Sequence, residues 1–525
     1  MRKNILLLSL FLLLILLLIS CGQPKYKTIT AEELRDKIAG GWAGKMIGVT
    51  YGAPTEFRAT GKTYDKELLW TSDQVKGSLH QDDLYVQMSF MMTMDKYGVD
   101  APAEKFAESF ANAGYQLWCA NVTARKNYFD GIMPPNSGNP KYNLWADAID
   151  FQIEADYIGF MSPGMPQTSN HICDKIGHIM NYGDGVYGGM FVCALYTQAF
   201  FEKDIGTIVN NALKAIPAKS GYAKCVRDVI DLYAKYPDDW RKAWLELQEK
   251  WGDCDISVPL NPFNIDAKLN GGYIVMGLLY GEGDFAKTME ISIRCGQDSD
   301  CNPSNAAAVL GVRDGYSSIP NKWKSGIPEI EDSTFIFTDY SFNKVVENTL
   351  KYAKEFVLAN GGKIKGNELH IKEQMPKAPE EIEVSFMGIK PLYRADVYND
   401  KWSWKGNWGE KEIRGLFNQK IKVADKKGAE ASFKFNGCGI LIEGTWDRDG
   451  GKADVYLDGQ LVRTIDTYYW VDNNGYGHAY LYHVLDLPKG DHTVRIVLNG
   501  EKNSKATGTK LHIRGAVVYT TNRSS

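Results

Sequence analysis

Gly296–Asn302 reads GQDSDCN and Gln81–Tyr85 reads QDDLY. A stretch of small residues, 304–310, follows the first, and an apolar stretch, 86–94, follows the second, so both patterns predict aspartates at a helix start. Either pair alone has an ordinary explanation, because aspartates there cap free N–H groups and complement the helix dipole. Together, carboxylates from two helix starts suit hard divalent cations, which prefer oxygen ligands. The candidate ligands are Asp82, Asp83, Asp298 and Asp300.

The chain around these stretches reads mainly as helix from Thr30 to about Phe356. Thr30–Glu33 forms a capping box, and apolar residues follow at four-residue spacing. Glycine-rich breaks punctuate the helices, and no alternation of strands with helices recurs. This half is predicted to be an all-α domain. The apolar residues of its first helix are Leu34, Ile38, Trp42 and Met46.

The pattern changes after about Lys377. Alternating residues such as those of 453–457 predict short strands, and Asp458-Gly459 predicts a hairpin turn between two of them. Strands at this spacing favour an antiparallel, jelly-roll-like β-sandwich. We therefore expect a multidomain protein with a helical catalytic domain over 31–361, a polar linker over 362–381 and a sandwich over 382–525.

The two aspartate motifs resemble the T-D-D and G-G-D-T-D-T/S signatures of the ADP-ribosylglycohydrolase family. Ile47–Glu56 (IGVTYGAPTE) resembles the amino-terminal I-G-D-A-x-G-x-P-x-E motif of the same family. The three motifs stand in family order, and the resemblance covers roughly Ala31 to Tyr352. It implies an all-α bundle, in agreement with the periodicity.

The resemblance further implies a binuclear site, normally magnesium or manganese, held by the four aspartates named above. Glu56 takes the place of a family glutamate that serves as acid or base, so the candidate catalytic residues are Glu56, Asp82 and Asp300. Two departures matter: Gln81 replaces a threonine, and Cys301 replaces the last hydroxyl ligand. A thiol is a poor partner for magnesium, so we expect one or two ions, with manganese or calcium as alternatives. Cys301 is better interpreted as a packing residue than as a ligand.

A central region resembles a branch of the family found in envelope proteins. It comprises 153–159, 162–164 and the glycine-rich stretch 181–189. Glycines let a backbone approach a ligand closely, so substrate contacts are expected here. A turn-forming role or a buried, hydrogen-bonded role is equally consistent with each carboxylate. The candidate substrate-binding residues are Glu154, Asp156, Asp184 and Tyr182.

The amino terminus reads as a targeting segment. Arg2 and Lys3 precede an apolar run, 5–19, that is shorter than the ~20 residues of a membrane-spanning helix. Leu18–Cys21 (LISC) resembles a bacterial lipobox. We expect a signal peptide over 1–20, lipidation of Cys21, a tether over 21–30, and an outer-membrane lipoprotein of the bacterial envelope facing the periplasm or the surface.

The net charge of the chain and the character of its carboxy-terminal half indicate which molecules the protein binds. The net charge of −4 and the lack of a basic stripe argue against nucleic acid. The carboxy-terminal half resembles galactose-binding-like, carbohydrate-binding sandwiches, for instance in Gly451–Gly459. We expect hydrolysis of a glycosidic bond in a glycan or another sugar-containing substrate. Two alternatives remain open: hydrolysis of ADP-ribosyl or N-ribosyl bonds, and a non-catalytic glycan-binding lipoprotein.

Overall fold

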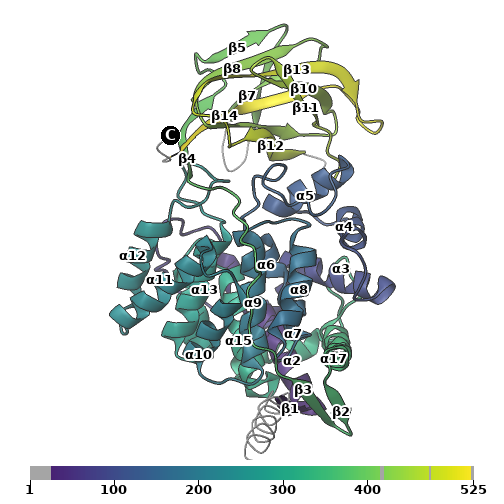
Figure 1. Ribbon diagram of the computed structural model, residues 1–525, viewed down its shortest axis with the longest axis vertical. Helices are drawn as coiled ribbons and strands as arrows, with labels where there is room; N and C mark the ends of the chain where they lie inside the picture. Colours follow the sequence, from purple (N-terminus) through teal and green to yellow (C-terminus); the bar gives the residue numbers. More distant parts are fainter. Residues whose placement is uncertain (1–24, 414–418, 472–474, 522–525) are drawn as a thin grey trace, which may run out of the picture.

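The protein is built of a helical domain and a β-sandwich stacked end to end (Figure 1). The computed structural model describes residues 25–413, 419–471 and 475–521. The predicted signal peptide and Cys21 lie outside these residues. Within them, no helix combines the length and the apolar character that crossing a membrane requires.

The helical domain has a buried centre formed by α2, α9, α13 and α15, around which the other helices pack. The longer helices are α2 (Ala31–Gly52), α3 (Asp82–Tyr97), α4 (Ala103–Asn112), α5 (Cys119–Phe129), α8 (Pro166–Gly177), α9 (Asp184–Ala199), α10 (Ile205–Ala212), α11 (Gly221–Lys235), α12 (Trp240–Trp251), α13 (Ala267–Gly281), α14 (Phe285–Arg294), α15 (Cys301–Asp314) and α17 (Phe342–Ala359). Short helices are α6 (Asp150–Glu154), α7 (Asp156–Phe160) and α16 (Asn321–Lys324).

The sandwich consists of two antiparallel sheets. One has the order β11-β10-β13-β8-β5, and the other has the order β12-β9-β14-β7-β6 with β4 also paired to β14. Its strands are β4 (Ile389–Asp396), β5 (Trp402–Lys405), β6 (Gly409–Ile413), β7 (Gln419–Ala424), β8 (Glu430–Gly437), β9 (Gly439–Trp446), β10 (Gly451–Leu457), β11 (Gln460–Asp466), β12 (Tyr476–Val484), β13 (Gly490–Lys502) and β14 (Leu511–Thr521). The predicted turn joins β10 to β11, and both Asp458 and Gly459 have positive φ, as a tight hairpin of this kind requires. The predicted fold class, a helical domain followed by an antiparallel sandwich, is confirmed.

Two stretches expected to be irregular contain strands. Within the predicted tether, Tyr26–Thr30 forms β1, and within the predicted linker, Lys363–Lys365 and Glu368–Lys372 form β2 and β3. These three make a separate antiparallel sheet of order β1-β3-β2. Leu369 and Ile371 are buried from one face of β3, so this sheet packs on the helical domain instead of being a free spacer.

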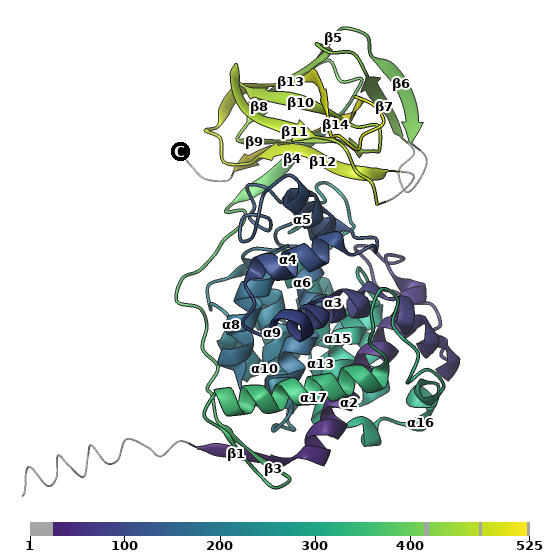
Figure 2. The same ribbon diagram turned by 90° about the vertical axis from the view of Figure 1, so that its right-hand side faces the viewer.

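The chain between β3 and β4 runs along the side of the helical domain up to the sandwich (Figure 2). We call residues 373–388 the strap. The side chain of Gln374 accepts hydrogen bonds from the backbone N–H groups of Gln167 and Thr168, both at 3.0 Å. Further along, Glu383 pairs with His178, with 3.0 Å between Oε1 and Nε2. Polar and proline-rich composition suggested a linker, but these contacts fix the strap to α8 and its surroundings.

The sandwich rests on the loops and on α5 at one end of the helical domain (Figure 2). The Tyr480 ring stacks on that of Trp145 at 5.1 Å between centroids, and its hydroxyl donates to the carbonyl of Ser257 at 2.5 Å. His483 Nε2 lies 2.7 Å from the carbonyl oxygen of Pro140. Stacked rings and hydrogen bonds to backbone carbonyls thus hold one face of the sandwich against the helices.

Candidate metal centre and active site

The first and third sequence motifs are brought together because α2 packs against α15 at backbone distance. A Cβ atom added to Gly48 would lie 2.5 Å from the carbonyl oxygen of Pro303, and one added to Gly52 would lie 2.1 Å from that of Ser299. Only glycine fits so close an approach. At the end of α2, the hydroxyls of Thr55 and Ser299 are 2.7 Å apart. The loop that carries Asp298 and Asp300 is therefore fixed beside Glu56.

A buried lysine connects the second motif, Gln81–Tyr85, to the same region of the domain. Lys45 Nζ, from the middle of α2, lies 2.9 Å from Asp83 Oδ1 and 2.8 Å from Asp156 Oδ2. It also donates to the carbonyl of Ile153 at 2.8 Å. Burial alone would lower the pKa of Lys45, but the two carboxylates raise it above its ordinary value. Lys45 thus stays charged and holds α3 and α7 in place.

Asp298, Asp300 and Cys301 complete the cluster at the start of α15. All three are buried, and a ligand atom from each lies within 4.8 Å of the others. Burial raises the pKa of Asp298 to about 7 and that of Asp82 to about 6. Burial, together with the charge of Asp298, also raises the pKa of Asp300 well above its usual value. A raised pKa means that these carboxylates lack enough neighbouring positive charge to stabilise their ionised form.

The residues present fit a divalent cation. Asp298 Oδ1, Asp300 Oδ1 and Asn302 Oδ1 are buried and have no hydrogen-bond partner among the described residues. A buried oxygen without a partner is costly, and hard cations bind this kind of oxygen. Asp82, Asp83, Asp298 and Asp300 would hold the ion or ions, with the amide oxygen of Asn302 as an additional donor.

Cys301 has another role in this arrangement. Its Sγ donates to Asp83 Oδ2 at 3.1 Å. Burial and the carboxylates of Asp298 and Asp300 raise the pKa of its thiol well above the usual value, so it keeps its proton. A protonated thiol is a poor ligand for a hard ion. The geometry favours Cys301 as a donor that orients Asp83.

Glu56 lies at the exposed rim of the cluster. Partial burial of its carboxyl group, followed by the charges of Asp300, Asp82 and Asp83, raises its pKa to about 8. A carboxyl group that holds a proton near neutral pH suits a general acid.

Glu154 lies close to the aspartates, while Asp156 is fully engaged. Glu154 Oε1 accepts from Asn121 Nδ2 at 2.5 Å, and its Oε2 is buried without a partner among the described residues. Asp156 accepts hydrogen bonds from the side chains of Gln87, Tyr196 and Asn305, in addition to its ion pair with Lys45. Glu154 therefore retains one buried oxygen without a partner among the described residues, and Asp156 positions Lys45.

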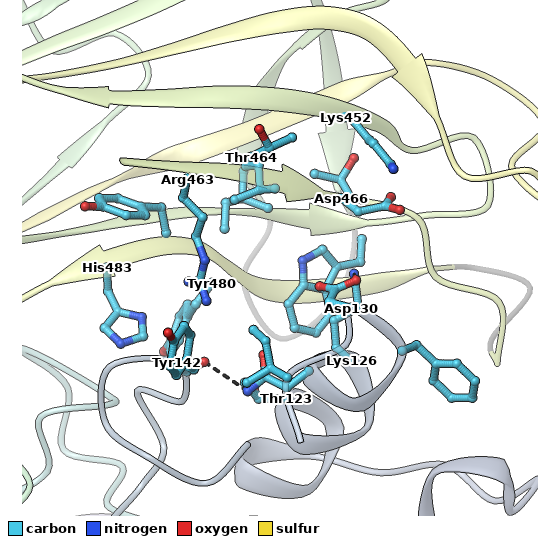
Figure 3. Close-up of a pocket in the computed structure, with 18 of the residues that line it drawn as sticks. Thr123, Lys126, Asp130, Tyr142, Lys452, Arg463, Thr464, Asp466, Tyr480 and His483 are labelled. Atoms are coloured by element: carbon cyan, nitrogen blue, oxygen red, sulfur yellow. Dashed lines mark hydrogen bonds and ion pairs between the residues drawn. The ribbon is translucent and has the colours of Figure 1, made fainter. Parts of the chain in front are cut away.

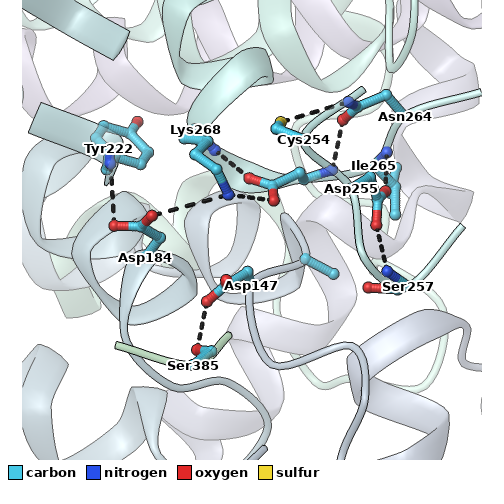
Figure 4. Close-up of polar contacts among 12 residues, drawn as sticks. Asp147, Asp184, Tyr222, Cys254, Asp255, Ser257, Asn264, Ile265, Lys268 and Ser385 are labelled. Atoms are coloured by element: carbon cyan, nitrogen blue, oxygen red, sulfur yellow. Dashed lines mark hydrogen bonds and ion pairs between the residues drawn. The ribbon is translucent and has the colours of Figure 1, made fainter. Parts of the chain in front are cut away.

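Asp184 lies in another polar network (Figure 4), and Tyr182 packs elsewhere, against His178. Asp184 Oδ1 accepts from the backbone N–H of Tyr222 at 2.9 Å, and its Oδ2 lies 3.8 Å from Lys268 Nζ. The Tyr182 ring packs edge-on against His178, at 5.8 Å between centroids, next to the strap. Within the described residues, these contacts connect Asp184 and Tyr182 to their own surroundings and not to the four aspartates.

The family profile described as ADP-ribosylglycohydrolase matches residues 30–354. The chain belongs to the ADP-ribosylglycohydrolase family.

Other similarities are more limited. A curated protein from Flavonifractor plautii, named A type blood alpha-D-galactosamine galactosaminidase, is 30% identical over 112 residues, which is 21% of this chain but only 10% of that protein. A solved structure titled ADP-ribosylglycohydrolase-related protein complex aligns over 61% of this chain and 98% of its own, at 12% identity and a TM-score of 0.44. A family 35 carbohydrate binding module from an environmental isolate aligns over 25% of this chain and 94% of its own, at 13% identity and a TM-score of 0.18.

Several residues of this ADP-ribosylglycohydrolase-family site were not found from the sequence. Lys45 is the cation that neutralises Asp83, and its position amid the buried residues of α2 was the available signal. Asp150 accepts from the backbone N–H groups of Asn121 and Ala120 at 3.0 and 3.3 Å, and burial raises its pKa to about 7. Because Asp150 and Glu154 are four residues apart, they share a helix face, which spacing alone could have indicated.

Proposed function

We propose that this protein is a metal-dependent glycoside hydrolase. The single observation that carries the proposal is the set of buried, unpartnered oxygens on Asp298, Asp300 and Asn302, next to Asp82 and Asp83. Membership of the ADP-ribosylglycohydrolase family supports hydrolysis as the reaction.

Each residue has a role in this proposal. One or two magnesium ions, with manganese or calcium as alternatives, would polarise the scissile centre or a water molecule. The four aspartates would hold the ions at the place where the sugar hydroxyls bind, and Lys45 and Cys301 keep Asp83 in position. Glu56 delivers a proton to the leaving oxygen from the rim, where its raised pKa leaves it protonated near neutral pH.

We further propose a glycan or another glycoconjugate as the substrate. The curated relative is named as a galactosaminidase, which supports a sugar substrate. The appended sandwich, which resembles carbohydrate-binding sandwiches, supports the same class of substrate. The lipobox-like LISC at Leu18–Cys21 supports a location in the bacterial envelope, with the chain anchored by lipid at Cys21. Hydrolysis of ADP-ribosyl or N-ribosyl bonds is the second candidate, because the family takes its name from that activity.

The test uses the full chain with magnesium, manganese or calcium on a panel of nitrophenyl glycosides, polysaccharides and an ADP-ribosylated protein. Release of sugar that requires a metal and is lost in Asp82→Ala/Asp300→Ala is the expected result. Asp147→Asn, in the network of Asp184, is the matched control and should keep activity. Release of ADP-ribose alone would select the second candidate, and sugar binding without turnover would make the protein a non-catalytic glycan binder.

A further inference from the structure

A cavity of about 380 Å³ lies between the helical domain and the sandwich (Figure 3). Its floor comes from the second half of α5 and the loop to Tyr142, and its roof comes from β11 and β12, each an edge strand of its sheet. Cavities of this size at domain interfaces are common sites for small ligands. None of the residues that line it belongs to the metal centre.

Arg463 is the notable group in this cavity. It comes from β11, and its guanidinium lies 4.9 Å from the centre of the Tyr142 ring. Within the described part of the chain its guanidinium has no hydrogen bond and no ion pair within 4 Å, and burial lowers its pKa from the usual value. A partly desolvated guanidinium stacked on an aromatic ring presents its N–H donors to a planar anion.

The remaining charges leave one positive charge in excess. Lys126 and Asp130 pair with each other at 2.5 Å on α5. Asp466 accepts from the backbone N–H of Tyr468 at 2.9 Å. Lys452 and Arg463 complete the set, which makes three cations and two carboxylates. His483 adds no charge near neutral pH, since burial lowers its pKa to about 4.

We infer that this cavity binds a saccharide that carries a carboxylate, such as a uronic or sialic acid unit. Arg463 pairs with the carboxylate through parallel N–H donors, a geometry that this side chain provides and a lysine does not. Asp130 and Asp466 accept hydrogen bonds from sugar hydroxyls, and the rings of Tyr142 and Tyr482 supply apolar surface for the sugar ring. The inference concerns a second site and does not rest on the proposed reaction.

The site is also placed to act together with the metal centre through α5. In the first turn of this helix, the backbone N–H groups of Ala120 and Asn121 donate to Asp150 beside the aspartates, while Thr123 and Lys126 line the cavity. An acidic unit bound in the cavity would thus lie on the same helix that borders the metal centre.

Binding to the full chain is measured by ligand-observed NMR with glucuronic acid, N-acetylneuraminic acid, galactose and inorganic phosphate. We expect the acidic sugars to bind at least tenfold more tightly than galactose or phosphate. Arg463→Gln should weaken their binding at least tenfold, and Arg463→Lys should weaken it less. Arg495→Gln is the matched control, because Arg495 also lies over a tyrosine ring, that of Tyr456 at 4.0 Å, but outside the cavity. It should leave binding unchanged, and thermal unfolding of each variant should show intact folding.

Asp300→Asn separates this inference from the proposed function. It should remove turnover and leave binding of the acidic sugar intact. Loss of binding in Asp300→Asn but not in Arg463→Gln would overturn the inference, as would equal affinity for galactose. Phosphate binding as tight as that of the acidic sugars would also overturn it, since the cavity would then recognise an anion without its sugar.

Discussion

Two buried groups of aspartates in the helical domain resemble each other in composition but differ in how their charges are balanced. In the network of Figure 4, Lys268 pairs with Asp266 and approaches Asp184, and Asp147 accepts from the hydroxyl of Ser385 at 2.5 Å. No side-chain oxygen of these three aspartates is left buried and unpartnered in the described chain. At the start of α15, by contrast, oxygens of Asp298 and Asp300 are left in that state.

A cluster of buried carboxylates is therefore not by itself a metal site. A complete set of protein partners indicates a structural role, whereas an incomplete set leaves coordination to an ion. The sequence analysis placed Asp184 among the candidate substrate-binding residues because it lies in the glycine-rich stretch 181–189, where a backbone can approach a ligand closely.

The largest expected effect separates the two groups by activity. Asp300→Asn should lower metal-dependent turnover roughly a thousandfold or more, because transition-state stabilisation by the ion is worth several kcal/mol. The metal-free variant should be as stable as the parent or more so, since one of several crowded carboxylates is removed. Turnover and urea unfolding measure the two quantities. Asp184→Asn should keep turnover and lower the free energy of unfolding. If Asp300→Asn lost as much stability as Asp184→Asn, the two groups of aspartates would not differ in the way described.

Replacing Lys268, the cation that balances the second group of aspartates, should have the next largest effect. Lys268→Met leaves Asp266 and Asp184 buried without their partner, which we expect to lower the free energy of unfolding by about 3–5 kcal/mol. Urea denaturation measures the change, and added magnesium should not restore it. Full recovery on adding magnesium would mean that this network, too, binds ions.

Metal binding itself should stabilise the protein through the α15 group alone. At an ion concentration of about 100 times the dissociation constant, the free energy of unfolding should rise by about 2.7 kcal/mol. Thermal unfolding with magnesium or manganese, and again after a chelator, measures the shift. The shift should persist in Asp147→Asn and vanish in Asp298→Asn. Its persistence in Asp298→Asn would place the ion elsewhere.

The smallest expected effect is the pH dependence of ion binding. Burial raises the pKa of Asp298 to about 7 and that of Asp82 to about 6, so protons compete with the ion as the pH falls. Apparent affinity should fall by about tenfold between pH 7 and 6, where Asp298 takes up a proton, and by about fiftyfold between pH 6 and 5, where Asp82 does so as well. Over the same range, these protonations should make the metal-free protein more stable, because its folded carboxyl groups bind protons more tightly than the unfolded chain does. Calorimetric titration at pH 5, 6 and 7 measures the affinity, and a flat profile would contradict the assignment of these ligands.

The sequence supported the fold well because helix periodicity, the capping box and the Asp-Gly hairpin are local signals. It also singled out Glu56 and the four aspartates, which lie in short contiguous motifs. It missed Lys45, because the role of a lysine inside a helix depends on which carboxylates from distant parts of the sequence pack against it. The sequence did not predict that the strap is fixed to the helical domain, because Gln374 and Glu383 contact residues about two hundred positions away.

The pairing of β1 with β3 sets an order for synthesis. Thr30 faces Glu368 and Tyr26 faces Lys372, so the partner of the first described strand leaves the ribosome only after every helix of its domain. A nascent chain that has not reached β3 leaves β1 as an unpaired edge, which can pair with other chains. Completion of the helical domain is therefore a late event in translation, and it occurs just before the sandwich begins to emerge.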